Sequence, residues 1–208
     1  YPFVTDKTLQ ADMAAQMKFN LVNPQDTDAA FRLAFSGGWT YSTNGAQPNG
    51  TNGYADTKLV TGTELGNDIS FSIYSRTTGT STGRDIGYDG TFTQGIICQY
   101  NGATAYFRNG TDATYAVGTA QGFFVDSKNS TTGNKGYING TNVANSTYQS
   151  VITNLNAYIG AAQTTGSPNF YSIRQNAFTH FGTSLTDAEA ALLYQLVQDF
   201  QTTLSRNV

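Results

Sequence analysis

Asn-Gly dipeptides are the feature that most restricts the fold of this chain. Six of them punctuate the 208 residues, at 44–45, 49–50, 52–53, 101–102, 109–110 and 139–140. A type I′ turn places both of its central residues at positive φ, which Asn and Gly tolerate better than other residues. Short strand-like runs lie between the dipeptides. The pattern therefore predicts a series of antiparallel hairpins, and hence an all-β protein.

The runs around these turns alternate in the way of half-buried strands. In the segment 69–76, Ile69, Phe71 and Ile73 share one face and serines occupy the other. Further strands are expected within 99–107, 122–127, 136–143, 156–160 and 177–182. Turn signals at this spacing are typical of a sandwich or jelly roll.

The composition agrees with strands and turns. Charged residues make up 12% of the chain, about half the usual share, and Gly, Asn and Thr take their place. Thr favours strands, and the 13% of aromatic residues are enough to fill a core. Because no linker or shift in composition divides the chain, we expect a single domain over residues 1–208.

One segment has helical periodicity. Thr186-Asp187-Ala188-Glu189 has the residues of a capping box, in which the threonine hydroxyl accepts from the glutamate N–H and the glutamate side chain reaches back. Behind it, apolar residues recur at helical spacing over 190–204. We therefore expect a C-terminal helix over 186–205. Residues 1–30 are expected to form an N-terminal arm or a short helix.

Five segments resemble, in order, the strands, hairpin and closing helix of laminin-G-like domains in the concanavalin A-like superfamily. They are NGTNGYAD at 49–56, ISFSIY at 69–74, KGYINGT at 135–141, LNAYIGA at 155–161 and SLTDAEAALLY at 184–194. The resemblance runs from about residue 30 to the C-terminus. It implies an antiparallel β-sandwich, a jelly roll of the concanavalin A/laminin-G-like type, with one C-terminal α-helix.

Three further segments are similar to laminin-G-like proteins of tailed phages and environmental bacteria. They are DTDAAFRL at 26–33, GGWT at 37–40 and LVQDFQTTLSR at 196–206. In those proteins the domain is a virion appendage or surface module. The resemblance implies a virion location, or alternatively an extracellular or cell-surface one, with other virion or surface proteins as partners. We also expect a homo-oligomer, because a weak single-site glycan contact gains from multivalency.

The acidic residues do not form the pair that glycoside hydrolysis requires. Retaining enzymes need two carboxylates about 5–5.5 Å apart, and no strand-like run carries two acids at alternate positions. The only glutamates are Glu64, in a turn-like stretch, and Glu189, in the capping box. The single histidine, His180, and the single cysteine, Cys98, lie in strand-like runs where structural roles are more common. We therefore expect no catalytic residues, and a protein that is not an enzyme.

Aromatic rings flanked by Asn and Thr are the residues expected to bind a ligand. Sugar recognition uses exposed rings that stack on pyranose faces and polar groups that bind the hydroxyls. The rings in question are Trp39, Tyr41, Tyr54, Tyr88, Tyr100 and Tyr115. Packing in the core is the alternative for each of them, and for Trp39 in particular.

Calcium is the one cofactor that the acidic residues leave open. Calcium takes oxygen ligands, and Asp85 with Asp89 and Asp26 with Asp28 are the close acidic pairs. Acids in turns more often bond their own backbone, so we expect no cofactor, with calcium at Asp85 and Asp89 as the alternative.

Nucleic acid and membrane are not expected as partners. The net charge of −3 gives no basic surface for nucleic acid, and no window of apolar residues is long enough for a membrane span. The leading hypothesis is a non-catalytic virion or surface structural module (a phage appendage, decoration or fibre domain) that binds host glycans or a receptor. The alternatives are a purely structural assembly subunit without a ligand and, against the count of acids, a glycoside hydrolase.

Overall fold

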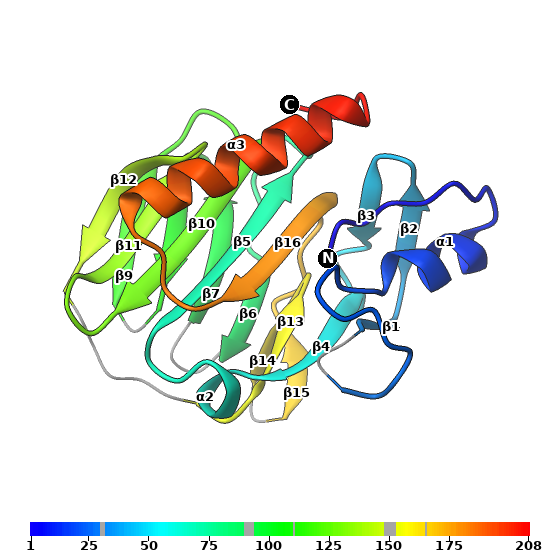
Figure 1. Cartoon of the computed structure of the whole chain (residues 1–208), viewed down its shortest axis with the longest axis horizontal. Coiled ribbons are helices and arrows are strands. Elements are labelled where there is room, and N and C mark those ends of the chain that lie inside the picture. Colours follow the sequence, from blue (N-terminus) through cyan, green and yellow to red (C-terminus); the bar gives the residue numbers. More distant parts are fainter. Residues whose placement is uncertain (30–31, 90–93, 110, 148–152, 165) are drawn as a thin grey trace.

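The computed structural model describes residues 1–29, 32–89, 94–109, 111–147, 153–164 and 166–208, with Asp89 by its backbone alone. Two seven-stranded antiparallel sheets pack face to face as a sandwich (Figure 1). A long helix near the C-terminus lies outside the second sheet. The expected all-β sandwich with one C-terminal helix is therefore confirmed.

The elements follow a simple layout in each sheet. The first sheet has the order β1 (Ala34–Ser36), β4 (Tyr54–Val60), β13 (Asn156–Ile159), β6 (Ile86–Asp89), β7 (Gln94–Tyr100), β8 (Thr104–Arg108), β9 (Asp112–Ala116). The second has the order β12 (Thr141–Ser146), β11 (Gly133–Ile138), β10 (Gly122–Asn129), β5 (Ile69–Ser75), β16 (Asn176–Gly182), β3 (Gly45–Pro48), β2 (Trp39–Ser42). A separate hairpin joins β14 (Ala162–Thr164) and β15 (Ser167–Asn169), and the helices are α1 (Gln10–Met17), α2 (Thr61–Glu64) and α3 (Asp187–Thr203).

Two of the Asn-Gly steps have the backbone that the sequence predicts. Asn101-Gly102 joins β7 to β8 and Asn139-Gly140 joins β11 to β12, and all four residues have positive φ. The step at 44–45 joins β2 to β3. The steps at 49–50 and 52–53 form no hairpin, because the chain there crosses from β3 in one sheet to β4 in the other. The remaining step includes a residue outside the described ranges.

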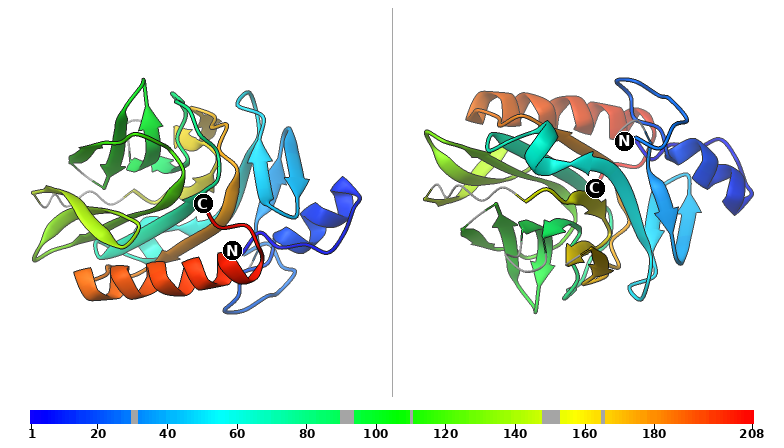
Figure 2. Two further views of the ribbon diagram at one scale, coloured as in Figure 1. Left: turned by 90° about the horizontal axis from the view of Figure 1, so that it is seen from above. Right: turned by 90° about the horizontal axis from the view of Figure 1, so that it is seen from below.

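The space between the sheets holds the main apolar core. Ile69, Phe71 and Ile73 of β5 face it, as the alternation predicts, and meet Ile96 and Phe107 from the first sheet. The opposite face of β5 is buried as well, because it lies under α3 rather than in water (Figure 2). The serines of β5 therefore occupy a second interior layer, which alternation alone does not reveal.

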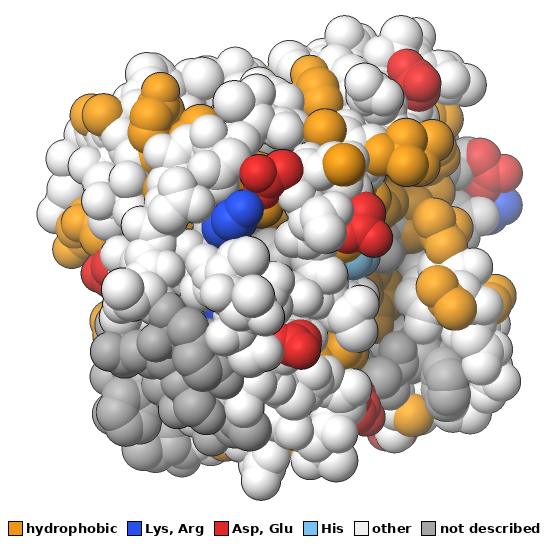
Figure 3. Space-filling view, turned by 60° about the vertical axis from the view of Figure 1, so that its left-hand side comes forward, with side chains coloured by type: hydrophobic (Ala, Val, Ile, Leu, Met, Phe, Trp, Pro, Cys, Tyr) orange, Lys and Arg blue, Asp and Glu red, His pale blue; other side chains and the backbone are white. Residues whose placement is uncertain are grey.

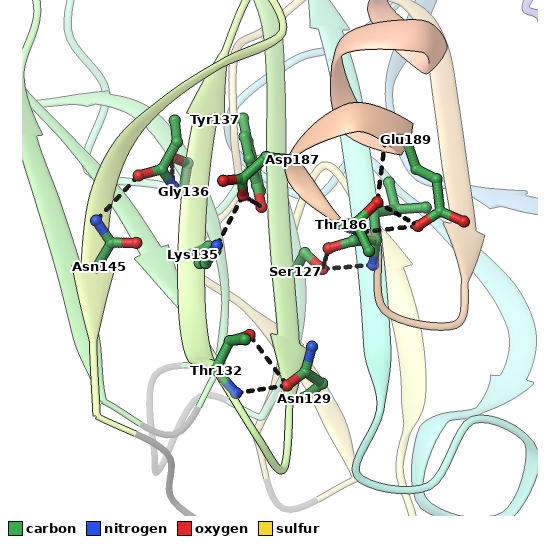
Figure 4. A network of polar contacts seen from close by, with 12 residues as sticks. Ser127, Asn129, Thr132, Lys135, Gly136, Tyr137, Asn145, Thr186, Asp187 and Glu189 are labelled. Atoms are coloured by element: carbon green, nitrogen blue, oxygen red, sulfur yellow. Dashed lines mark hydrogen bonds and ion pairs between the residues drawn. The ribbon is translucent and has the colours of Figure 1, made fainter.

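The N-terminus of α3 has the predicted capping box. The Glu189 N–H donates to the Thr186 hydroxyl at 3.3 Å, and the Thr186 N–H donates to the Glu189 carboxylate at 2.8 Å. Asp187 in the first turn accepts from Lys135 at 2.7 Å and from the Tyr137 hydroxyl at 2.9 Å (Figure 4). The helix expected over 186–205 thus spans 187–203, and its first turn is bonded to β11.

The apolar stripe of α3 closes a second hydrophobic cluster. Ala190 and Val197 are buried against Tyr74, Phe123 and Tyr137 of the sheet beneath. This packing places the helix along the outer face of the second sheet, so that helix, second sheet and first sheet form three layers (Figure 2).

Arg206, which is 1% exposed, fixes the chain beyond α3. Its guanidinium donates five hydrogen bonds, to Gln201 Oε1 (2.6 Å) and to the carbonyls of Pro2 (2.7 Å), Phe3 (2.8 Å), Ala177 (2.8 Å) and Thr43 (3.3 Å). A guanidinium has five N–H donors, so every one of them is used. The contacts tie the last residues to the N-terminal segment and to β16.

The N-terminal segment contains one of the two expected alternatives, a short helix. Met13 and Met17 of α1 are buried, and the side-chain amide of Gln10 exchanges two hydrogen bonds with the backbone of Tyr41, at 2.7 and 2.8 Å. The amide thereby satisfies the N–H and carbonyl of Tyr41 on β2, which is the edge strand of the second sheet and would otherwise leave them unpaired. None of the helices in the described ranges is long and apolar enough to cross a membrane.

Candidate ligand-binding cleft on the first sheet

The outer faces of the two sheets differ in what covers them. α3 lies across the second sheet, whereas in the described part of the chain the first sheet has the β14–β15 hairpin packed beside β6 and no long helix over it (Figure 2). A cleft of about 430 Å³ lies next to this hairpin. Its lining includes the rings of Tyr100, Phe170 and Tyr171, the guanidinium groups of Arg84 and Arg108, and Asn169.

A β-bulge turns Tyr100 toward the cleft. Ile97 of β7 lies opposite Tyr106, but Tyr100 lies opposite Thr104, so β7 has one residue more than β8 over this stretch. Residues that lie opposite each other point to the same face of a sheet, and Phe107 faces the core, so Tyr106 faces outward. The extra residue therefore moves Tyr100 to the outer face, where its ring meets that of Tyr106 edge to face at 5.6 Å.

Arg108 extends this outward row. Its guanidinium carbon lies 4.2 Å from the centroid of the Tyr106 ring. One terminal nitrogen lies 3.0 Å from the carboxylate of Asp112, which stands opposite it on β9 and is half-exposed. Arg108 is thus held by a ring on one side and by one surface acid.

Arg84, just before β6, is 5% exposed and less well partnered. Its guanidinium carbon lies 5.0 Å from the centroid of the Phe170 ring. Among the described residues its side chain makes no ion pair or hydrogen bond, and its Nε is buried without a partner. Burial, and next the positive charge of Arg108, lower the pKa of Arg84 to about 10. The group stays protonated at neutral pH, so two cations share the cleft.

The loop after β15 presents an exposed ring on a strained backbone. Phe170 has φ of 53° and is 39% exposed; the left-handed conformation costs an aromatic residue on the order of 1 kcal/mol. Its N–H donates to Asn169 Oδ1 at 2.8 Å, and its carbonyl accepts from the Arg84 N–H at 2.7 Å. Gly83 makes the approach possible, since a Cβ there would lie 2.1 Å from the Tyr171 carbonyl oxygen. Strain of this kind, at an exposed apolar ring, is a feature of ligand sites.

Of the rings expected to bind a ligand, only Tyr100 lines this cleft. Trp39 and Tyr54 are half-buried and Tyr41 is buried. The Trp39 indole donates to the carbonyls of Ser36 (3.0 Å) and Tyr54 (3.2 Å), and its ring stacks with that of Tyr41 at 6.2 Å. The rings of Trp39 and Tyr41 both pack edge to face on Phe35 of β1, whereas the ring of Tyr54 packs on Tyr158 of β13 at 4.8 Å. The packing alternative therefore describes Trp39 and its neighbours.

Tyr88 lies in the interior. It is buried, its ring packs edge to face on Phe71 at 5.8 Å, and its hydroxyl donates to Asn109. The prediction that Tyr88 stacks on a ligand is therefore wrong, because its position in β6 directs the ring into the core.

Asp85 is buried and bonded within the protein. Its carboxylate accepts from the Cys98 N–H at 2.7 Å and from the Ser172 hydroxyl, and it lies 3.8 Å from Arg174 Nε. Both of its oxygens thus serve to join the segment before β6 to β7 and to the chain before β16. The side chain of Asp89 lies outside the described part of the protein, so calcium at this pair stays a prediction. Within the described residues, no group of three or more His, Cys, Asp or Glu side chains is placed to hold a metal ion.

The single cysteine and single histidine also have packing roles. Cys98 is fully buried, and burial raises the pKa of its thiol. His180 borders a second, mainly apolar hollow of about 390 Å³ between residues 20–23 and β16, where Figure 3 shows it in pale blue among hydrophobic side chains. Burial lowers the pKa of His180 to about 4, with a smaller effect from the Tyr1 amino group. Its buried Nδ1 has no hydrogen-bond partner among the described residues.

The cleft residues Arg84, Arg108, Phe170 and Tyr171 were not among those expected from the sequence. One local signal was present: in Tyr106-Phe107-Arg108 the core residue Phe107 implies that Tyr106 and Arg108 face outward together. No local signal connects them with Phe170, which arrives from a hairpin far along the chain.

No family model and no curated protein sequence matches this chain. Among solved structures, Trypanosoma rangeli sialidase in complex with sialic acid is similar with a TM-score of 0.54 and 16% identity, over 78% of this chain and 29% of that one. The structure described as NanB plus Optactamide is similar with a TM-score of 0.50 and 14% identity, over 74% of this chain and 27% of that one. Domain 4 of AbnA, a GH43 extracellular arabinanase from Geobacillus stearothermophilus, in complex with arabinotriose, gives 0.48 and 18%, over 86% of each chain.

The likenesses to the Trypanosoma rangeli sialidase and to NanB concern the class of fold. The chain is a β-sandwich of two large sheets, and it spans less than a third of the sialidase chain that it resembles. At such low identity the likeness extends to the fold alone.

Proposed function

We propose that this chain is a non-catalytic carbohydrate-binding module of a virion or cell surface, and that the cleft on the first sheet is its ligand site. The observation that carries the proposal is the cleft itself, in which aromatic rings, two guanidinium groups and an amide converge on one open face. Rings of this kind stack on sugar faces, and convergent donors bind hydroxyl groups. The fold is shared with parts of glycan-processing proteins, so carbohydrate is the ligand class to test first.

The absence of catalysis is part of the proposal. Among the described residues that line the cleft there is no carboxylate, and Asp112 beside it is paired with Arg108. Most enzymes that hydrolyse a glycosidic bond use two carboxyl groups on either side of that bond. A sensitive assay for released oligosaccharides is expected to detect nothing, and cleavage that is lost in the Asp112→Asn variant would contradict this part.

A glycan array tests the binding function. The wild-type chain is expected to bind a defined set of glycans, and Tyr100→Ala and Phe170→Ala are each expected to weaken that binding about tenfold or more through loss of ring contact. Tyr115→Ala is the matched control, because Tyr115 is exposed on the same sheet but does not line the cleft. Silence across the array, or equal losses in the control, would contradict the proposal and favour a purely structural subunit.

The location and partners are proposed on different grounds. They rest on the resemblance of segments 26–33, 37–40 and 196–206 to virion and surface proteins, with other virion or surface proteins and further copies of the chain as partners. Mass spectrometry and electron microscopy of purified particles test this, and a chain absent from both particles and cell surfaces would refute it.

A further inference from the structure

Among the described residues, the cleft holds two cations and only one acid within ion-pair distance of either. Arg84 and Arg108 both line it, and among the described residues the acid within ion-pair distance is the half-exposed Asp112, 3.0 Å from Arg108. Asp112 and Asp85 act on Arg84 only at longer range. Arg84 makes no ion pair among the described residues although it is almost fully buried. A buried charge that lacks a partner is unfavourable, so a site of this kind favours an anion from outside.

The rings determine which part of each guanidinium is available. Phe170 lies over Arg84 at 5.0 Å and Tyr106 lies beside Arg108 at 4.2 Å, measured from guanidinium carbon to ring centroid. A ring on one side of a guanidinium leaves the edge formed by its two terminal nitrogens, and the Nε of each arginine is buried. Those edges form the planar fork that binds carboxylate, sulfate or phosphate through two parallel hydrogen bonds.

Aromatic surface lies within reach of the same charges. The Tyr100 ring packs on Tyr106, and Phe170 is exposed beside Arg84. A small inorganic anion would bind the guanidinium groups without contacting these rings. A ligand that joins a sugar ring to an acidic group would contact both the aromatic and the cationic parts of the cleft.

We infer that the cleft selects acidic saccharides, with Arg84 and Arg108 binding a carboxylate or sulfate group while the sugar ring stacks on Tyr100 or Phe170. This inference rests on the proposed carbohydrate-binding function and names its substrate class. Carboxylate and sulfate share the same chemistry toward a guanidinium, so the experiment separates the two sources.

Calorimetric titration with matched ligand pairs tests the inference. Oligogalacturonate is compared with its methyl ester, which keeps the sugar ring and removes the charge, and dextran sulfate is compared with dextran. At least one acidic member is expected to bind about tenfold or more tightly than its neutral partner, with an advantage that declines as salt is raised. Whichever pair shows the preference identifies the acidic group.

Variants assign the preference to the two arginines. Arg84→Gln and Arg108→Gln are each expected to remove most of it, whereas Asp112→Asn is expected to increase it several-fold, because the competing carboxylate is gone. Arg32→Gln removes one arginine charge outside the cleft and is expected to leave the preference unchanged. If Arg84→Gln does not fold, Arg108→Gln and Asp112→Asn decide the matter, since Asp112 is largely in solvent.

The outcomes separate this inference from the function on which it rests. Equal binding of acidic and neutral ligands that is still lost in Tyr100→Ala would overturn the acidic preference and leave carbohydrate binding intact. Preference that survives both arginine variants would overturn the assigned residues. Failure of every saccharide, neutral and acidic, would overturn both proposals.

Discussion

The arginine beyond α3 and the arginines of the cleft have opposite surroundings. Arg206 donates five hydrogen bonds, four of them to backbone carbonyls, and no donor is left over. Arg84 is also nearly buried, yet it meets an aromatic ring and, among the described residues, no acceptor. The surroundings of Arg206 provide a hydrogen-bond acceptor for each of its donors. The described surroundings of Arg84 enclose the side chain but provide no acceptor.

This difference distinguishes a structural cation from a binding one. Moving a guanidinium out of water costs several kcal/mol unless hydrogen bonds replace its hydration. Carbonyls of the chain do so for Arg206, so that its charge contributes to the fold. For Arg84 the described residues provide no such acceptor, and this is why we propose that its charge serves recognition.

The largest loss of stability is expected from substitution of Arg206, whose donors are all hydrogen-bonded. Arg206→Met leaves four carbonyls and the Gln201 amide without their donor, in the interior, and we expect it to lower the free energy of unfolding by about 3–5 kcal/mol. Urea unfolding followed by intrinsic fluorescence measures this. A loss below about 1 kcal/mol would show that water readily replaces the guanidinium, and the contrast between the two regions would disappear.

The second largest loss of stability is expected from substitution of Gly83, which packs against the loop that lines the cleft. A Cβ at Gly83 would lie 2.1 Å from the Tyr171 carbonyl oxygen, so Gly83→Ala must displace the 169–171 loop. We expect a loss of about 2 kcal/mol in stability, together with loss of glycan binding because Phe170 moves away from Arg84. Gly118→Ala is the control, because nothing lies within 4 Å of its Cβ. Unchanged binding in Gly83→Ala would mean that the position of the loop does not matter to the ligand.

The same two regions show what the sequence could predict. The closing helix follows from local signals, since the capping box of Thr186 and Glu189 and the apolar stripe behind it are complete within one segment. The hairpins at Asn101 and Asn139 follow from two residues each. Arg206 adjoins this helix, but its acceptors come from residues 2, 3, 43 and 177, which no local pattern connects.

The cleft was less accessible to prediction for a physical reason. Tyr100 faces outward only because a bulge interrupts the alternation of β7, while Tyr88 was expected to bind and instead faces the core. Arg84 and Phe170 meet through a contact between segments more than eighty residues apart in sequence. A site built from a bulge, a strained loop and two separate strands depends on the complete fold.

His180 is a third basic side chain in a largely buried position, and unlike the two arginines it can lose its proton near neutral pH. Burial lowers the pKa of its imidazole from 6.5 to about 4. As the pH falls below 6.5 the unfolded chain takes up a proton before the folded chain does, so stability is complete above 6.5 and is lost toward pH 4. Because the ring still reaches the surface of its hollow, we expect a loss of roughly 1–2 kcal/mol over this range.

The measurement compares wild type with His180→Gln between pH 7 and pH 5, above the range in which the surface carboxylates titrate. The variant is expected to show a flatter dependence of unfolding free energy on pH than the wild type. Parallel curves would show that the imidazole takes up its proton at the same pH in the folded and unfolded chains, and therefore that burial does not lower its pKa.

Substitution of Arg84 is expected to have the smallest effect on stability, although it is expected to have the largest effect on ligand recognition. Arg84 cannot release its proton at neutral pH, unlike His180, and none of the described residues has an acceptor that its removal would leave unpaired. Arg84→Met keeps the packing against Phe170 and removes a charge that the fold does not satisfy, so we expect the free energy of unfolding to stay within about 1 kcal/mol of wild type or to rise. Urea unfolding beside that of Arg206→Met makes the comparison direct. Equal losses in the two variants would mean that Arg84 has internal acceptors after all, and its charge would then belong to the fold rather than to a ligand.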